Sequence, residues 1–202
     1  MRYPRVPAVL LLFAILFIGA AGEGRAEETI VFLRHGEKPS GGYGQLTCQG
    51  FNRSLALPAV LLAKYGRPNI LYAPNPAVKI PDPAGSFYYI RPLATLEPLA
   101  VRLGMDVRTK YGYSDIASLQ AALIAPTRDD LTIFVAWEHA HLQKVVQNIM
   151  NSYGGGAVVP AWILGDYDSL YVVRVTYAGS TVTASFRRDS ERLNGQPTTC
   201  PF

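Results

Sequence analysis

The sequence contains few of the residues that bind metals and haem. Of its 202 residues, only two are cysteines and three are histidines, fewer than a haem protein or a protein with several zinc sites normally uses. Two cysteines in so long a chain also exclude a small fold held together by a disulfide framework. Charged residues make up only 17% of the chain and hydrophobic residues 49%. This composition excludes a disordered chain and indicates one domain with a substantial core.

The sequence also has no internal repeat, no domain linker and no cluster of lysine and arginine. Its formal charge is +4. The first 26 residues carry three arginines and one glutamate, a net of +2, so the remaining residues carry a net of +2. Such a small positive charge without a basic cluster predicts no nucleic-acid partner.

The first 26 residues have the pattern of a secretory signal peptide. Two arginines precede an apolar run over residues 7–21, and Gly24 and Ala26 place small residues before a cleavage site. The run is shorter than the roughly 20 residues of a membrane-spanning helix, and an uncleaved N-terminal anchor is the alternative. We therefore expect residues 1–26 to be removed, leaving a single exported domain, 27–202, in the periplasm or outside the cell, without stable membrane association.

Export would also allow the two cysteines to form a disulfide. Disulfides persist in oxidising compartments, and a Cys48–Cys200 bond would tie the C-terminal tail to the segment near residue 48. Two unpaired cysteines are the alternative, because nothing in the sequence shows that they lie close together.

Strand and helix patterns alternate along the chain. Continuous apolar runs over 29–33 and 131–137 predict strands that are buried on both faces. Helices are predicted over 47–65, 92–103, 114–123 and 141–150, a short strand over 69–72, and a terminal hairpin over 170–177 and 181–186. We therefore expect an α/β fold of three layers, a mostly parallel sheet with helices on both faces and antiparallel C-terminal hairpin strands.

Prolines mark two exceptions to this regular pattern. Pro58 lies inside the helix predicted over 47–65 and predicts a kink or a break there. Residues 73–90 contain four prolines and predict a long connection, of the kind that often covers a binding pocket.

All three histidines follow one of the two buried strands. His35 follows the first strand directly after Arg34, and His139 and His141 follow the second. Ligands bind to such sheets outside the carboxyl ends of the strands. A guanidinium can hold a phosphate through two hydrogen bonds, and a neutral imidazole can attack phosphorus. The sequence therefore predicts a phosphate site at this edge, whereas the Arg-His pair alone would indicate an ordinary surface turn.

Four segments at strand or helix ends carry a more specific signal. They are LRHGE at 33–37, LTCQGFNRS at 46–54, RPLAT at 91–95 and WEH at 137–139. In this order and spacing they resemble the signature segments of the histidine phosphatase superfamily, whose fold is that of phosphoglycerate mutase. The resemblance extends over residues 29–187. It departs from the family pattern at Pro92, where family members usually have alanine.

The resemblance implies a phosphatase that works through a covalent phosphohistidine without a metal or cofactor. His35 would accept the phosphoryl group, and Arg34, Arg91 and His139 would bind it. The substrate would be a small phosphorylated molecule or a phosphopeptide. The alternative is an inactive or weakly active domain of the same fold that binds a phosphorylated ligand. A mutase fits poorly with an exported protein.

The residue that protonates the leaving group is not evident from the sequence. One branch of the family has an aspartate directly after the second histidine, where this chain has Ala140. The candidates are Glu138, beside His139, and Asp115, which is equally well placed to cap a helix. A metal site at Glu138, His139 and His141 is disfavoured because only two imidazoles lie there.

Three further charged residues have two interpretations each. Glu37 and Lys38 would either orient the substrate or carry solvated loop charges. Arg53 is either an ordinary helix residue or a support for the pocket.

Overall fold

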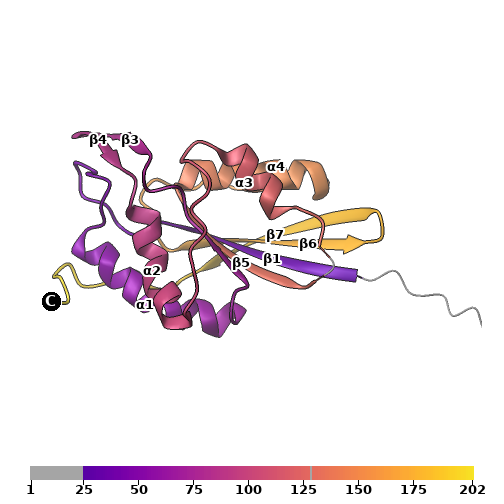
Figure 1. The fold of residues 1–202 in the computed structure, drawn as a ribbon, viewed down its shortest axis with the longest axis horizontal. Coiled ribbons are helices and arrows are strands. Elements are labelled where there is room, and N and C mark those ends of the chain that lie inside the picture. Colours follow the sequence, from indigo (N-terminus) through magenta and orange to yellow (C-terminus); the bar gives the residue numbers. More distant parts are fainter. Residues whose placement is uncertain (1–24, 128) are drawn as a thin grey trace, which may run out of the picture.

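A computed structural model describes residues 25–127 and 129–202, and most of the predicted signal peptide lies outside these ranges. Five strands form one sheet in the order β2-β5-β1-β6-β7 (Figure 1). They are β1 (Arg25–Arg34), β2 (Ile70–Tyr72), β5 (Leu131–Trp137), β6 (Ser169–Ala178) and β7 (Thr181–Ser190). β5 pairs in parallel with β1 and β2, whereas β6 pairs antiparallel with β1 and β7. The predicted α/β class with an antiparallel C-terminal hairpin is confirmed.

Helices cover both faces of the sheet (Figure 1). α1 (Cys48–Tyr65) and α2 (Arg91–Leu103) lie on one face, and α3 (Ile116–Leu123) and α4 (His139–Tyr153) lie on the other. Successive β1 side chains point to opposite faces, so that Ile30 and Phe32 pack toward α4 while Val31 and Leu33 pack toward α1. Burial of each such side chain contributes about 1.5–3 kcal/mol, which fixes the orientation of the strand and of the residues that follow it.

Helix α1 begins and ends as the sequence predicts. The side chain of Thr47 accepts a hydrogen bond from the amide of Gly50 at 3.1 Å, and Gly66 ends the helix. The predicted break at Pro58 does not occur, because α1 continues through this residue as one helix. Pro58 removes a single amide, and the burial of Leu57 and Leu61 on the same side keeps the helix against the sheet.

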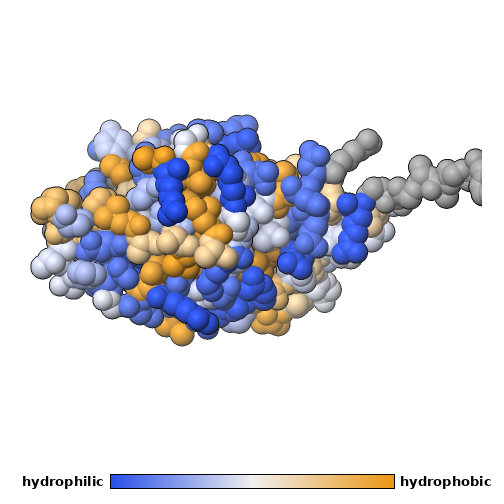
Figure 2. All heavy atoms as spheres, turned by 90° about the horizontal axis from the view of Figure 1, so that it is seen from below, coloured by the Kyte–Doolittle hydropathy of each residue, from blue (hydrophilic) through white to orange (hydrophobic). Residues whose placement is uncertain are grey.

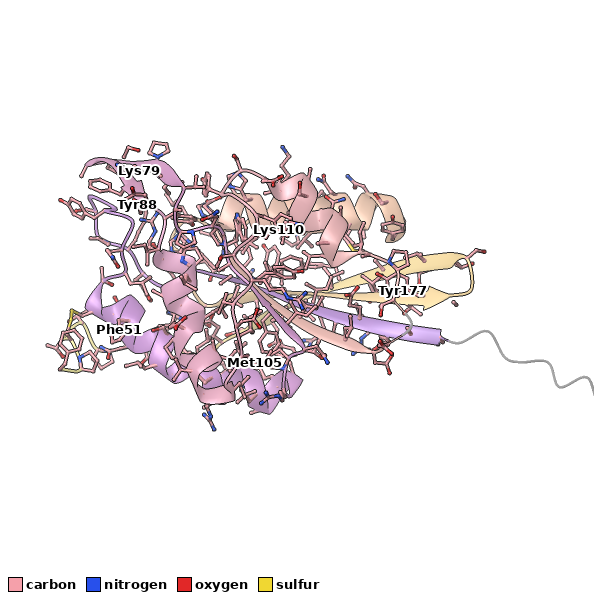
Figure 3. The ribbon with its side chains drawn as sticks, in the orientation of Figure 1. Phe51, Lys79, Tyr88, Met105, Lys110 and Tyr177 are labelled. Carbon is pink, nitrogen blue, oxygen red and sulfur yellow. A yellow bond between two sulfur atoms is a disulfide. The ribbon has the colours of Figure 1, made fainter. Side chains whose placement is uncertain are left out.

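The proline-rich connection contains a hairpin that the sequence analysis missed. β3 (Lys79–Asp82) and β4 (Gly85–Tyr88) form a separate two-stranded sheet. Pro81 is tolerated there because edge strands need fewer backbone donors. The hairpin lies at the end of the molecule near the start of α2 (Figure 1). The ammonium of Lys79 lies 5.0 Å from the ring centre of Tyr88 across the hairpin (Figure 3).

The C-terminal tail is fastened to the first turns of α1. Cys48 and Cys200 form a disulfide, with their Cα atoms 4.6 Å apart, next to Phe51 (Figure 3). The side-chain amide of Asn52 donates hydrogen bonds to the carbonyls of Pro197 and Thr199, both at 2.8 Å. The tail therefore restrains the end of α1 that faces the loop after β1.

The surface mixes residue types. On the face seen in Figure 2, hydrophilic and hydrophobic residues are interspersed rather than gathered in one block. In residues 25–127 and 129–202, no helix has both the length and the apolar character needed to cross a bilayer.

Replacing both cysteines by serine is expected to lower the free energy of unfolding by about 2–4 kcal/mol, because the bond closes a very long loop in the unfolded chain. Urea titration of the oxidised wild type and of the Cys48→Ser/Cys200→Ser variant measures the difference. A reductant should destabilise the wild type and leave the variant unchanged. Equal midpoints for the two oxidised proteins would contradict the expectation.

Candidate active site

His35 lies at the carboxyl end of β1, beside the end of β5. Its amide donates a hydrogen bond to the carbonyl of Trp137 at 3.1 Å, and the residue is only 2% exposed. Its Nδ1 atom lies 2.7 Å from the carbonyl oxygen of Gly36. Because only a protonated Nδ1 can donate to a carbonyl, this contact leaves the lone pair on Nε2.

Burial is the largest cause that lowers the pKa of His35, and together with the charges of Arg91 and Arg34 it brings this pKa to about 3, against the opposing effects of the Gly36 carbonyl and Glu138. The side chain is therefore neutral at pH 7. A buried, neutral imidazole with a free Nε2 atom has the form that a histidine nucleophile requires.

Arg34 lies beside His35 and is held by the segment that precedes β6. Its NH1 group donates hydrogen bonds to the carbonyls of Leu164 and Asp166, the latter at 3.1 Å. Its guanidinium carbon lies 3.9 Å from the ring centre of Tyr167. The Nε atom is buried and has no hydrogen-bond partner among the described residues. One donor of this arginine is therefore available to a ligand.

Arg91 is the first residue of α2 and is held by an aspartate that the sequence analysis did not identify. Its NH1 and NH2 groups donate to the two carboxylate oxygens of Asp82, at 2.7 and 3.2 Å. As at Arg34, the buried Nε atom has no hydrogen-bond partner in the described part of the chain. The prolines around Asp82 predicted a loop, whereas the structure has a strand, β3, that places Asp82 at the site.

Glu138 caps helix α4 and lies between two histidines. Its Oε2 atom accepts hydrogen bonds from the amide of His141 at 2.9 Å and from Nδ1 of the same residue at 2.8 Å. Its Oε1 atom lies 2.5 Å from Nδ1 of His139, although the geometry is not that of a hydrogen bond. Burial would raise the pKa of Glu138, but contacts with His139, His141 and the backbone amides outweigh it and hold the pKa well below its usual range.

These groups surround one pocket of about 140 Å³, the His35 pocket. Of the residues predicted for the site, the structure brings Arg34, His35, Arg91, Glu138 and His139 to this pocket. Its other lining residues are Lys38, Ile80, Pro81, Asp82, Tyr113 and Leu164. Asp82, Tyr113 and Leu164 come from segments without a recognised motif, which is why sequence reasoning missed them.

Asp115 does not reach the His35 pocket. It is exposed at the start of α3, and its side chain makes no capping hydrogen bond. His141 does not line the pocket. Its ring packs against that of the lining residue Tyr113, with the ring centres 4.4 Å apart. In the described ranges, no group of three or more histidine, cysteine, aspartate or glutamate side chains is arranged to hold a metal ion.

The loop after His35 is positioned by close backbone contacts. A Cβ atom on Gly36 would lie 2.8 Å from the carbonyl oxygen of Gly50 in α1, so a larger residue would push the loop and the helix apart. The amide of Gly36 donates to Oγ1 of Thr95 at 3.0 Å, and Thr95 in turn donates to the carbonyl of Arg91. The motifs at 33–37, 46–54 and 91–95 therefore meet at the backbone of Gly36.

Arg53 of α1 binds a residue of this loop and is only 1% exposed. It binds the carboxylate of Glu37 at 2.7–3.1 Å, that of Glu191 at 2.7 Å and that of Asp168 at 3.3 Å. Of the two interpretations of Arg53, its position agrees with support for the pocket. Its partners Asp168 and Glu191 are distant in the sequence, so no local pattern indicated them.

The excess of carboxylates around Arg53 affects Glu191. Burial is the largest cause that raises the pKa of Glu191, to about 8, and the charges of Asp168 and Glu37 add to it while Arg53 opposes it. The side chain therefore holds a proton at neutral pH in the folded protein but not in the unfolded chain, whose glutamates titrate near 4.3.

The contribution of Glu191 to stability is expected to be present below about pH 4.5 and to be lost as the pH rises through about 8. Glu191→Gln cannot lose a proton, so the variant should become more stable relative to the wild type between pH 5 and 9. Urea titrations at several pH values measure this difference in unfolding free energy. A difference that stays constant over this range would show that Glu191 is ionised in the folded protein.

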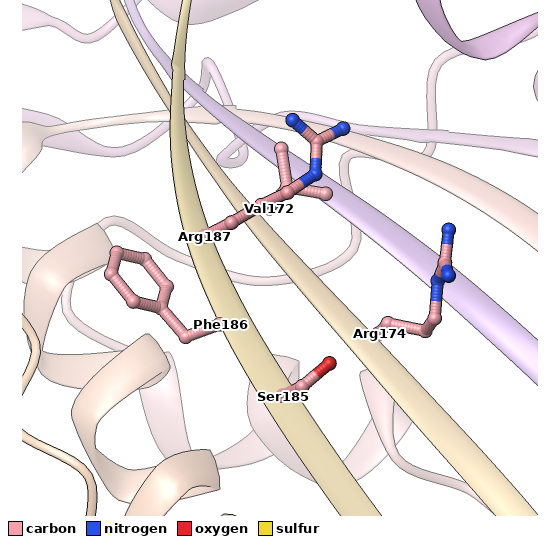
Figure 4. A pocket seen from close by; sticks show the side chains of 5 residues that line it. All are labelled: Val172, Arg174, Ser185, Phe186 and Arg187. Atoms are coloured by element: carbon pink, nitrogen blue, oxygen red, sulfur yellow. The ribbon is translucent and has the colours of Figure 1, made fainter.

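A second cavity of about 110 Å³ lies on the β6–β7 hairpin and shares no lining residue with the His35 pocket (Figure 4). It is lined by Val172, Arg174, Ser185, Phe186 and Arg187. It contains none of the predicted site residues.

A scan of protein-family models and a search of curated proteins give no match to the chain. Solved structures do match. A protein assigned as phosphohistidine phosphatase SixA from Nakamurella multipartitia is 14% identical over 81% of this chain and 96% of its own, with a TM-score of 0.54. A mycobacterial glucosyl-3-phosphoglycerate phosphatase is 14% identical over 80% and 97%, with a TM-score of 0.51.

Phosphoglycerate mutase from Plasmodium falciparum is 10% identical over 82% of this chain and 92% of its own, with a TM-score of 0.50. At these identities the comparisons establish a shared fold over about four fifths of the chain.

Proposed function

We propose that this protein, which has the fold of the histidine phosphatase superfamily, hydrolyses phosphate monoesters through a covalent phosphohistidine at His35. The observation that carries the proposal is the state of His35. It is buried and neutral, its Nδ1 atom is engaged by the Gly36 carbonyl, and it shares a pocket with two buried arginines.

The pocket has the charge that a phosphoryl group requires. Arg34 and Arg91 each have an unpartnered buried Nε donor, counted among the described residues, and a bound phosphoryl group would accept hydrogen bonds from both. His139, in its protonated form, would add a third donor. Donors already fixed before the reaction stabilise the charge on the equatorial oxygens of the transition state, where phosphoryl-transfer enzymes gain most of their rate.

The chemistry then proceeds in two steps. Nε2 of His35 attacks phosphorus, the ester bond to the leaving oxygen breaks, and the leaving oxygen takes a proton. Water then attacks the phosphohistidine, the N–P bond breaks with its electron pair returning to Nε2, and phosphate is released. The pocket volume of about 140 Å³ suits a phosphoryl group and part of a small substrate, or the side chain of a phosphopeptide.

Replacing His35 by alanine is expected to abolish phosphate release from 4-nitrophenyl phosphate, because the variant lacks the buried imidazole that lies beside the two arginines of the pocket. Steady-state hydrolysis by the purified wild type and His35→Ala measures the effect. Asp106→Asn is a control, since Asp106 is exposed and outside the pocket lining. Full activity of His35→Ala would exclude the mechanism, and phosphate binding by an inactive wild type would favour a ligand-binding domain.

We also propose that the protein is exported. The signal-peptide pattern of residues 1–26 and the Cys48–Cys200 disulfide support this. Removal of residues 1–26 would take Arg25 and Ala26 from the start of β1, where they pair with Ala178 and Tyr177.

The mature chain is accordingly expected to begin at Glu27 and to be found outside the cytoplasm. Expression of the full chain in a bacterial host, followed by cell fractionation and N-terminal mass spectrometry, measures both. The Leu11→Arg/Leu12→Arg variant places two charges in the apolar run and should remain uncleaved in the cytoplasm. An intact Met1 on exported protein would instead indicate an anchor.

A further inference from the structure

Asp82 lines the His35 pocket and holds the fork of Arg91. Its carboxylate binds both terminal nitrogens of Arg91, accepts a hydrogen bond from the amide of Gly44 at 3.0 Å and lies 3.5 Å from the ammonium of Lys38. The side chain is only 3% exposed. An anion held by the fork of an arginine in a pocket for phosphate resembles the ligand that the arginine would bind.

The surrounding backbone is shaped to admit this carboxylate. Gly42 has a φ of +80°, and a Cβ atom there would lie 2.2 Å from Cγ of Asp82. The carbonyl of Gly42 also accepts a hydrogen bond from Arg91 at 3.3 Å. A residue with a side chain at position 42 would expel Asp82, so the glycine is required by the presence of the carboxylate and not only by the turn.

Among the described residues, Glu138 is the one other carboxylate that lines the pocket, and it is poorly suited to hold a proton. Its Oε2 atom accepts hydrogen bonds from the amide and from Nδ1 of His141, and its Oε1 atom lies close to Nδ1 of His139. These groups belong to the first turn of α4, the helix that Glu138 itself caps. Asp82 differs, because its main partner is a guanidinium that the phosphoryl group of a substrate also requires.

We propose that Asp82 is the group that protonates the leaving oxygen, and that substrate binding prepares it for this role by taking over Arg91. The proposal rests on the phosphohistidine mechanism above. In the free protein Asp82 is a carboxylate paired with Arg91. When the phosphoryl group accepts hydrogen bonds from the terminal nitrogens of Arg91 as well as from its Nε atom, Asp82 loses this cation, meets the negative phosphoryl oxygens and takes up a proton from solvent.

The charges around Asp82 agree with this exchange. Burial would raise the pKa of Asp82, but the hydrogen bonds from Arg91 and Gly44 and the charges of Arg91 and Lys38 hold it below its usual value in the free protein. When a substrate takes over Arg91, the effect of burial is opposed only by the hydrogen bond from Gly44 and by one cation, Lys38, which is 29% exposed at its side chain. The other titratable groups that line the pocket are Arg34, His35, Tyr113, Glu138 and His139.

The proton of Asp82 is transferred to the leaving oxygen as the bonds at phosphorus change. As the N–P bond to His35 forms, the P–O ester bond breaks and the leaving oxygen takes the proton of Asp82, which becomes a carboxylate. In the second step the carboxylate accepts a proton from the attacking water while the N–P bond breaks. After phosphate leaves, Asp82 releases this proton to solvent and pairs with Arg91 again.

The test compares substrates that differ in their need for a proton. The phenolate of 4-nitrophenyl phosphate can leave without being protonated. The alkoxide of glycerol 2-phosphate must receive a proton to leave. Asp82→Asn should therefore lower kcat/KM for glycerol 2-phosphate by about 100-fold or more, the usual range for loss of a general acid, and change it far less for 4-nitrophenyl phosphate. Asp82→Glu should restore part of the loss, and Asp106→Asn, at an exposed site, should change neither.

The ratio of the two values of kcat/KM is measured on one sample, so partly misfolded protein does not affect it. An equal loss with both substrates would show that Asp82 only positions Arg91, and no loss with either would show that another group donates the proton. Both outcomes overturn the assignment.

Failure of the wild type to hydrolyse either ester, or full activity of His35→Ala, would instead contradict the proposed function. If Asp82→Asn does not fold, the same ratio for Asp82→Glu decides: an unchanged ratio excludes Asp82 as the donor.

Discussion

Two guanidinium groups are buried beside a histidine at the carboxyl edge of the sheet, and much of the surrounding structure offsets the cost of burying them. A buried charge is expensive unless it is paired or hydrogen-bonded. Arg34 is held by backbone carbonyls and the face of Tyr167, and Arg91 by the carboxylate of Asp82. Neither arrangement engages the Nε atoms among the described residues. The same burial keeps His35 neutral, so one constraint produces both the proposed anion site and the proposed nucleophile.

The position of this site depends on contacts from the other end of the chain. Gly36 and Gly50 approach so closely that α1 and the loop after β1 must move together. Arg53 of α1 joins that loop to residues just before β6 and just after β7 through Glu37, Asp168 and Glu191. The Cys48–Cys200 disulfide joins the C-terminal tail to the start of α1. The stability of the fold and the geometry of the His35 pocket are therefore linked through the first turns of α1.

The parts of this account that follow from local patterns were predictable. Continuous apolar runs indicated β1 and β5, and the three histidines after them indicated the edge that bears the pocket. Asp82 was hidden because prolines are poor indicators of a strand, and its partner Arg91 lies nine positions along the chain, a separation with no meaning in a helix or strand pattern. Arg53 was ambiguous because its carboxylate partners Asp168 and Glu191 lie more than 100 positions away.

The central claim is that phosphorus becomes bonded to a nitrogen of His35. Rapid quenching of the wild type during hydrolysis of a phosphate ester, followed by peptide mass spectrometry under alkaline conditions that preserve phosphohistidine, tests it directly. We expect a phosphoryl group on the peptide that contains His35, the residue directly after β1, and its disappearance as the substrate is consumed. Turnover with no phosphorylated peptide, or with the phosphoryl group on another residue, would contradict it.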